Sequence, residues 1–159
     1  MNRVGLGYDI HRLEAGEGIV LAGCRIPCPY RLVAHSDGDA VLHALCDALL
    51  GAVGAGDLGE HFPDTDPLHR GRDSADFVRL VRNLPALRPW RLVNLDVNVI
   101  AQAPRLTDHK PRLRQRLSEL FDLPLDAVGL KARTNEHCDA VGAKQAIQVQ
   151  AVVLLERPG

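Results

Sequence analysis

Residues 35–53 read HSDGDAVLHALCDALLGAV and contain the segment that decides the fold. From Asp39 to Val53 nearly every position is apolar. If this segment is a helix, its apolar residues cover all of its faces and are not confined to one stripe. This pattern predicts a buried helix, because a helix at the surface keeps one polar face. Ser36 or Asp37 can cap its first turn with a side-chain oxygen. The rest of the chain must then cover this helix.

His43 is the one histidine inside this largely apolar helix. A single histidine in such a helix is usually a core residue with hydrogen-bonded ring nitrogens. Here Asp39 and Asp47 lie one turn before it and one turn after it. Carboxylates in these positions could fix the tautomer of the ring, as they do beside metal-binding histidines. The helix alone leaves both interpretations open.

The first strand supplies two further candidate ligands. Residues 3–11 (RVGLGYDIH) alternate between apolar residues and polar residues or glycines. Asp9 and His11 are two positions apart, so both side chains project from one face, which Gly5 and Gly7 share. These glycines would let another backbone or a substrate approach closely. Taken alone, such a pair more often marks an exposed strand end than a metal site.

Asp9, His11 and His43 together form a candidate ligand set for a divalent cation. Two imidazoles and one carboxylate are the protein half of a tetrahedral catalytic zinc site, which leaves the fourth position open. The sequence by itself does not bring the strand and the helix together. The ligand set is therefore a hypothesis that the fold must test.

A phosphate site is predicted directly before the buried helix. Backbone N–H groups at a helix start attract anions, and His35 and Ser36 could add donors. The pair Gly5-x-Gly7 is not followed by the third glycine of a dinucleotide fingerprint, and the chain has no P-loop motif. The anion would therefore be bound without either of these nucleotide-binding motifs.

The remaining segments predict an α/β sandwich of the α+β kind in one domain, residues 1–159. We expect a mixed β-sheet with helices mainly on one face, so that the other face is a natural oligomer surface. The elements expected after the first strand are strand pieces at 19–21 and 25–27, a loop at 54–73, a helix from Ser74, a strand at 91–101, a helix capped by Thr107 and Asp108 with Leu113, Leu117, Leu120 and Phe121 on its apolar face, and strands at 128–134 and 146–155.

The composition is that of an ordinary globular domain. Hydrophobic residues make up 46% and charged residues 25% of the 159 residues, enough for a core without disulfides. A net charge of −1 gives no basic surplus for nucleic acid or an anionic membrane. No apolar run approaches the roughly 20 residues of a membrane span. We expect a protein of the bacterial cytoplasm whose four cysteines are thiols.

Several stretches resemble the 2-C-methyl-D-erythritol 2,4-cyclodiphosphate synthase family of the non-mevalonate isoprenoid pathway. The combination of an Asp-x-His pair with HSDGD and FPDTDP is specific, and the resemblance covers nearly the whole chain. The matching stretches are GLGYDIHRL (5–13), AHSDGDAVLHALCDALLGAVGAGDLGEHFPDTDP (34–67), LVNLDVNVIAQAPRL (92–106), LKARTNEH (130–137) and QAVVLLE (150–156).

The resemblance implies a lyase of isoprene biosynthesis. In the family's reaction the 2-phosphate of 4-diphosphocytidyl-2-C-methyl-D-erythritol 2-phosphate attacks the β-phosphorus of its own diphosphate. The products are 2-C-methyl-D-erythritol 2,4-cyclodiphosphate and CMP. The resemblance places zinc, or a similar divalent cation, on Asp9, His11 and His43. It assigns His35 and Thr134 the catalytic role of stabilising the transition state.

The resemblance also implies where the substrate lies. Glu136 would bind a second cation, Mg²⁺ or Mn²⁺, at the diphosphate. The residues implied for the phosphates and the methylerythritol are Asp9, Ile10, His11, His35, Ser36, Asp57, Leu58, Gly59, Phe62, Pro63, Asp64, Thr65 and Asp66. Those implied for the cytidine and diphosphate are Ala101, Gln102, Ala103, Pro104, Arg105, Leu106, Lys131, Ala132, Arg133, Thr134, Asn135 and Glu136. The family's members are homotrimers with active sites at subunit interfaces, which implies a homotrimer here.

This chain departs from the family's pattern near residue 140. Many relatives carry a Phe at the position of Ala140 and an Arg at that of Ala143, which faces the trimer channel. Ala143 cannot bind a diphosphate there, and Lys144 could replace that Arg only if it faced the same side. Arg133 replaces a small hydroxyl residue and is either a phosphate contact or a solvated strand residue.

Two alternative functions stay open from the sequence. One is a zinc phosphoesterase, in which water and not the internal phosphate attacks. The other is a non-catalytic trimer that binds nucleotides or isoprenoid diphosphates. The presence of His35, Thr134 and Glu136 beside the metal ligands favours catalysis, because a binding protein need not keep them all.

Overall fold

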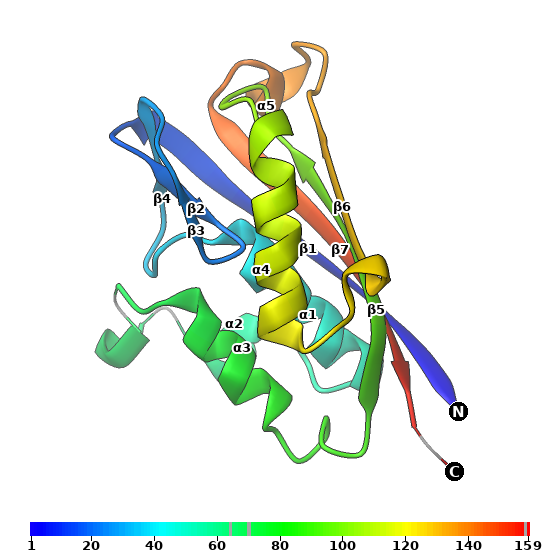
Figure 1. Ribbon diagram of the computed structural model, residues 1–159. Coiled ribbons are helices and arrows are strands. Elements are labelled where there is room, and N and C mark those ends of the chain that lie inside the picture. The colour runs from blue at the N-terminus through cyan, green and yellow to red at the C-terminus, as the bar shows by residue number, and fades with distance from the viewer. Residues whose placement is uncertain (64, 70, 158) are drawn as a thin grey trace.

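A five-stranded mixed sheet forms one layer of the protein (Figure 1). The computed structural model describes residues 1–63, 65–69, 71–157 and 159. Strands β5 and β6 pair in parallel, and the other neighbours pair antiparallel. A separate hairpin is formed by β2 (Ile19–Leu21) and β3 (Cys24–Ile26). In spatial order the sheet strands are β4 (Tyr30–Val33), β1 (Asn2–Ala15), β7 (Ala146–Glu156), β5 (Arg91–Ile100) and β6 (Val128–Arg133).

The helices form the second layer, on one side of the sheet (Figure 1). Helix α1 packs on β1 and β7, α3 packs on α1, and α4 packs against β6. The α/β sandwich with helices mainly on one face is thereby confirmed. The helices are α1 (Ala40–Val53), α2 (Leu58–His61), α3 (Ser74–Arg82), α4 (Lys110–Phe121) and α5 (Asp139–Gly142), with 3-10 turns at Pro67–His69, Thr107–His109 and Leu125–Ala127.

Helix α1 lies between the sheet and α3, and this position explains its apolar sequence. Leu42, Leu45 and Leu50 have no exposed surface. Each such side chain contributes on the order of 1.5–3 kcal/mol when it is fully buried. The predicted buried helix is confirmed, and it forms the centre of the core. No helix in the described part of the chain is long and apolar enough to cross a membrane.

Two glycines of β1 allow the strand and helix backbones to touch. A Cβ atom on Gly5 would lie 1.8 Å from the carbonyl oxygen of Ala48, and one on Gly7 would lie 1.8 Å from that of Ala44. Any larger residue would therefore push α1 away from the sheet. The expectation that these glycines admit another backbone is confirmed, and the backbone is that of α1.

The opposite face of β1 carries an apolar row that no described residue covers. Val4, Leu6, Tyr8 and Ile10 are between 44% and 69% exposed. Successive strand residues point to opposite faces, so these four lie on the side away from the helices. Large apolar side chains in a row are uncommon on the surface of a monomer. The uncovered sheet face that the sequence led us to expect is therefore present, and its use as an oligomer surface stays a prediction.

The predicted helix is confirmed to within one residue at its start, but the predicted cap of α1 is wrong. Asp39, and neither Ser36 nor Asp37, caps the helix, because its carboxylate accepts a hydrogen bond from the N–H of Leu42 at 3.1 Å. The same carboxylate accepts bonds from the N–H groups of Ala22 and Gly23 at 2.9 and 2.6 Å. Burial raises the pKa of Asp39 to about 6, although these donors oppose the rise. One buried side chain therefore joins the β2–β3 hairpin to the central helix.

The predicted cap of α4 is also wrong. Thr107 and Asp108 lie in a 3-10 turn, and α4 begins at Lys110 without a side-chain cap. Pro111 occupies the first turn, where a missing N–H costs no helical hydrogen bond. The predicted apolar face is confirmed for Leu113, Leu117 and Phe121, which are buried.

Other differences concern short elements. The first strand continues to Ala15, four residues beyond the predicted end at His11. Strand β4 and the four-residue helices α2 and α5 were not predicted. Segments of this length are too short to show a period of 2 or 3.6 residues, so their sequences gave no signal.

The close contact of β1 and α1 predicts a sharp difference between two glycine substitutions. Gly7→Ala should destabilise the protein by roughly 1–3 kcal/mol or more, because the new methyl group overlaps the α1 backbone. Gly51→Ala should be neutral or stabilising by up to about 1 kcal/mol, since it improves helix propensity and its Cβ would lie no closer than 3.8 Å to Leu6 O. Urea unfolding of the wild-type protein and both variants measures the change in the free energy of unfolding. Equal stability would contradict the close approach.

Candidate metal centre and substrate pocket

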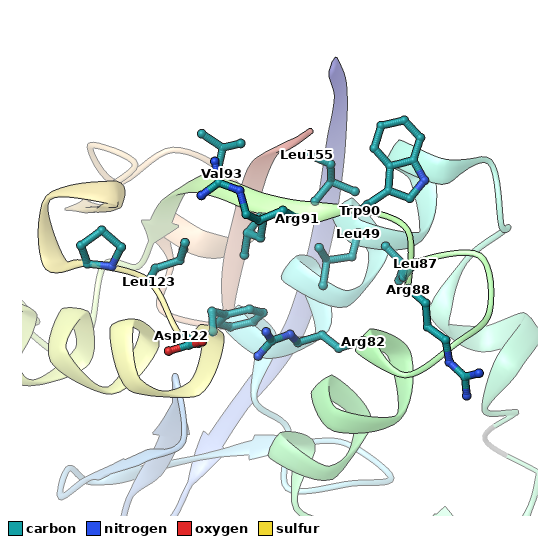
Figure 2. A pocket seen from close by; sticks show the side chains of 13 residues that line it. Leu49, Arg82, Leu87, Arg88, Trp90, Arg91, Val93, Asp122, Leu123 and Leu155 are labelled. Atoms are coloured by element: carbon teal, nitrogen blue, oxygen red, sulfur yellow. The ribbon is translucent and has the colours of Figure 1, made fainter. Parts of the chain in front are cut away.

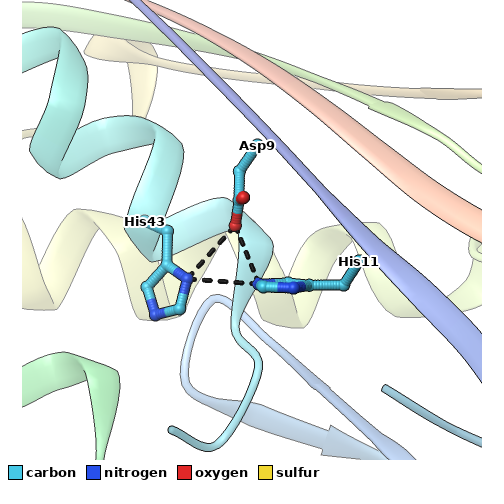
Figure 3. Close-up of side chains that lie close together, drawn as sticks. All are labelled: Asp9, His11 and His43. Atoms are coloured by element: carbon cyan, nitrogen blue, oxygen red, sulfur yellow. Dashed lines mark hydrogen bonds and ion pairs between the residues drawn. The ribbon is translucent and has the colours of Figure 1, made fainter. Parts of the chain in front are cut away.

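Three ligand-type side chains converge between β1 and α1 (Figure 3). Asp9 Oδ2 lies 2.9 Å from His11 Nε2 and 3.1 Å from His43 Nδ1. The two histidine nitrogens lie 3.2 Å apart. In the described part of the chain, this is the one group of three or more histidine, cysteine or acidic side chains close enough to share a metal ion. The fold thus brings together the three residues that the sequence suggested as ligands.

The cluster is electrostatically coupled. Burial raises the pKa of Asp9, but hydrogen bonds with His11 and His43 and their charges outweigh it, so the pKa lies below its usual range. Burial lowers the pKa of His43, but the hydrogen bond and charge of Asp9 outweigh it and raise that pKa. Asp9 is therefore ionised, and His43 holds a proton more firmly than a free imidazole. A bound cation must displace this proton, so metal binding weakens as the pH falls.

The hydrogen-bond partners of His43 differ from the prediction. Its Nε2 atom lies 2.9 Å from Ser74 Oγ and 3.2 Å from Ser36 Oγ. Asp47 accepts a bond from the N–H of Leu58 at 2.7 Å, and Asp39 caps α1. The suggestion that these two carboxylates fix the ring is therefore wrong. Ser74 was missed because it is 31 residues away in the sequence and only the fold brings it to His43.

A cavity of about 370 Å³ opens beside the cluster. It brings His35, Ser36, Leu58, Gly59 and Phe62 together with the three candidate ligands, as the resemblance implied. Its wall also includes residues that the sequence did not propose as substrate contacts, among them two aromatic rings. These additional lining residues are Val33, Ala34, Asp47, His69 and Phe77.

The loop after α1 closes this cavity only in part. Asp57 caps α2, where its Oδ1 atom accepts a bond from the N–H of Glu60 at 2.9 Å. The Asp66 carboxylate lies 3.6 Å from His69 Nε2. Pro63 and Thr65 are not among the lining residues, and Asp64 lies outside the described residues. Their roles at the substrate stay predictions.

Most of the residues implied for cytidine line a separate cavity of about 300 Å³. It lies between the ends of β5 and β6, and it shares no lining residue with the cavity at the cluster. Arg133, left open by the sequence, lies in its wall. The full lining is Ala101, Gln102, Pro104, Arg105, Leu106, Thr107, Ala132, Arg133 and Thr134.

The remaining predicted residues lie around these cavities. Thr134 donates from Oγ1 to Glu136 Oε1 at 3.2 Å, and Asn135 donates from Nδ2 to Asp139 at 2.7 Å. Lys131 forms an ion pair with Asp96 outside the lining of the second cavity. Ala103 is not in that lining itself, but it lies in the sequence between Gln102 and Pro104, which are. The side chain of Ile10 belongs to the uncovered face of β1.

The segment that departs from the family's pattern is not a strand. Ala140 lies in α5, and Ala143 and Lys144 follow it in a turn before β7 begins at Ala146. The alternation of strand faces therefore does not decide where Lys144 points, and that part of the sequence argument was wrong.

The largest of the described cavities, about 530 Å³, is elsewhere (Figure 2). Arg82, Arg88 and Arg91 surround it, and Leu49 from α1 reaches its floor. Arg91 is already paired with Glu156, and Arg82 donates to the carbonyl of Leu120 at 3.0 Å. None of its lining residues was proposed as a site residue from the sequence, and size alone gives the cavity no chemical role.

Comparisons with known proteins agree with this geometry. A family model described as the YgbB family matches residues 2–156. A curated 2-C-methyl-D-erythritol 2,4-cyclodiphosphate synthase from Pseudomonas putida is 48% identical over 153 residues, which cover 96% of this chain and 98% of the relative.

Solved structures extend the likeness to the fold. A synthase of the same name, in its CDP-bound form, has a TM-score of 0.89 at 44% identity and covers 97% of this chain and 100% of its own. A Plasmodium falciparum relative, solved as a CDP complex, has a TM-score of 0.86 at 31% identity and covers 99% and 97%. The chain therefore belongs to the YgbB family, that of the 2-C-methyl-D-erythritol 2,4-cyclodiphosphate synthases.

Proposed function

We propose that this protein converts 4-diphosphocytidyl-2-C-methyl-D-erythritol 2-phosphate to 2-C-methyl-D-erythritol 2,4-cyclodiphosphate and CMP. The observation that carries the proposal is the Asp9, His11 and His43 cluster at the mouth of a cavity that His35 and Ser36 also line. Family membership and the shared name of the curated relatives support it. The reaction is a step of non-mevalonate isoprenoid biosynthesis.

The reaction needs alignment more than it needs a strong base. A phosphate monoester has its second pKa near 6, so around neutral pH it is mostly a dianion and already nucleophilic. Nucleophile and electrophile belong to one molecule, and correct positioning of such groups contributes on the order of 7–11 kcal/mol. His35 and Ser36 would hold phosphate oxygens, and His35 and Thr134 would stabilise the charge of the transition state. The other predicted contacts would hold the substrate in a reactive bend.

Zinc is the proposed ion of the cluster. Two imidazole nitrogens and one carboxylate oxygen, all within 4.8 Å of one another, fit a tetrahedral zinc site with one open position. When bound, the cation would neutralise and orient phosphate oxygens. Asp9, His11 and His43 would hold it, and Ser74 and Ser36 would hold the ring of His43.

A second cation would bind at Glu136. This side chain is exposed, and its Oε1 atom accepts from the Thr134 hydroxyl at 3.2 Å. Carboxylates and phosphate oxygens are the ligands that Mg²⁺ and Mn²⁺ prefer. Glu136 would thus place this cation on the diphosphate, next to the residues implied for cytidine.

We further propose a homotrimer whose active sites lie between subunits. Two observations support it: the apolar row of Val4, Leu6, Tyr8 and Ile10 on the uncovered sheet face, and the absence of shared lining residues between the two cavities within the described chain. The metal cluster of one subunit would face the cytidine cavity of its neighbour. Lys131 and Arg133 would then lie near this boundary.

The proposed location is the bacterial cytoplasm. All four cysteines, Cys24, Cys28, Cys46 and Cys138, are free thiols, which suits a reducing compartment. Burial raises the pKa of Cys46 well above its usual value, so it is an inert core residue.

Phosphorus NMR of the reaction tests the proposed chemistry. The purified protein, given zinc, Mg²⁺ and 4-diphosphocytidyl-2-C-methyl-D-erythritol 2-phosphate, should form CMP and a cyclic diphosphate. Linear phosphate products would instead indicate a phosphoesterase. Unchanged substrate with a fully loaded metal site would indicate a binding protein, and either result would contradict the proposal.

Replacement of one ligand tests the metal site. His43→Ala should abolish zinc retention and turnover but leave the fold intact, because two ligands bind zinc far more weakly than three. His109→Ala, which removes a histidine in the turn before α4, is the control and should retain both. Zinc content after gel filtration measures metal retention, and phosphorus NMR of the reaction measures turnover. Circular dichroism checks that the fold is intact. Full activity of His43→Ala without bound zinc would overturn the site assignment.

A further inference from the structure

Ser74 is a buried serine in direct contact with a candidate metal ligand. It has no exposed surface, and its Oγ atom lies 2.9 Å from Nε2 of His43. It is the first residue of α3, whereas His43 belongs to α1. A buried hydroxyl needs hydrogen-bond partners, so the identity of its second partner decides what it does to the histidine.

The second partner of Ser74 is the carboxylate of Asp37. The Ser74 hydroxyl donates to Asp37 Oδ1, and the Ser74 N–H donates to Asp37 Oδ2 at 2.9 Å. The N–H of Asp39 also donates to Asp37 Oδ1, at 3.1 Å. A carboxylate only accepts hydrogen bonds. The one hydrogen of the Ser74 hydroxyl is therefore committed to Asp37, and Ser74 Oγ faces His43 with its lone pairs.

This polarity sets the position of the His43 proton. Because Ser74 Oγ can only accept from the ring, Nε2 of His43 must carry the hydrogen. The other nitrogen, Nδ1, is the one that lies near Asp9 and His11. A metal ligand must present a nitrogen lone pair, and a hydrogen bond at the other nitrogen decides which one it presents.

We propose that Ser74, fixed by Asp37, is a positioning residue that holds the proton of His43 on Nε2 and frees Nδ1 for a divalent cation. The inference rests on the proposed metal site and adds the part that orients it. Ser36 Oγ also lies near His43 Nε2, at 3.2 Å, and is a second, longer contact of that nitrogen. The same oxygen already accepts a hydrogen bond from the Gly38 N–H. The connection also ties the phosphate-binding segment before α1 to the first residue of α3.

Zinc affinity and the His43 ring proton test the proposal. Ser74→Ala should weaken zinc binding about 10- to 100-fold in a competition titration with a chelator, as is typical when such a partner is lost. In proton NMR of the zinc-loaded protein, the Nε2–H signal of His43 should be protected from solvent exchange. Ser74→Ala should lose that protection.

Two further variants separate orientation from general stability. Ser118→Ala removes a partly buried hydroxyl that donates to the Leu123 carbonyl, far from His43 in the sequence, and should change neither measurement. Asp37→Asn leaves one acceptor oxygen for the two groups of Ser74, so the hydroxyl can turn toward His43. Asp37→Asn should therefore show the same weaker zinc binding and the same loss of Nε2–H protection as Ser74→Ala. It provides an independent test if Ser74→Ala folds poorly.

Wild-type zinc affinity in the same titration checks the metal site independently. If the wild-type protein binds zinc and both Ser74→Ala and Asp37→Asn keep its affinity, the positioning role is wrong. Weaker binding with an unchanged, protected Nε2–H signal would also contradict it, because the ring would then be held by another group. A wild-type protein that fails to bind zinc would instead refute the proposed metal.

Discussion

The backbone contact between β1 and α1 is the constraint on which the rest of the protein depends. Gly5 and Gly7 remove the side chains that would separate the strand from the helix carbonyls of Ala48 and Ala44. The same alternation that turns these glycines toward α1 also turns Asp9 and His11 toward it. One register therefore sets both the packing of the core and the approach of two ligands to His43.

Two carboxylates, Asp39 fully buried and Asp37 partly buried, hold the neighbouring segments around this contact. Asp39 caps α1 and binds the turn of the β2–β3 hairpin, while Asp37 binds the start of α3. Both belong to the short HSDGD segment, so five consecutive residues combine the proposed phosphate site, a helix cap and a link between two helices. Burial of such groups is costly unless their hydrogen bonds are made, and here they are.

Periodicity predicted the fold well where elements are long. Residues 39–53 and 91–101 have clear patterns, and the structure places a central helix and a sheet strand, buried mainly in its second half, there. Helix starts were harder, because Ser36, Asp37 and Asp39 are all good caps and only tertiary contacts decide among them. Short elements such as β4 have no period to read.

The site was partly predictable for a related reason. Asp9 and His11 share a strand face, so their proximity follows from local geometry, and the polar interruption of an apolar helix drew attention to His43. The family resemblance joined the three. Ser74, His69 and Phe77 gave no signal: His69 and Phe77 line the cavity with their rings in contact, and Ser74 reaches His43 from the start of α3, only because the chain is folded. Contacts of this kind follow from the fold and not from spacing.

The central claim is that β1 and α1 present three donor atoms to one divalent cation. Anomalous X-ray diffraction at the zinc edge, on crystals of the zinc-loaded protein, tests it most directly. We expect one peak per chain, about 2.0–2.2 Å from Asp9 Oδ2, His11 Nε2 and His43 Nδ1. A cluster without a peak, or a zinc ion bound through Nε2 of His43, would contradict it.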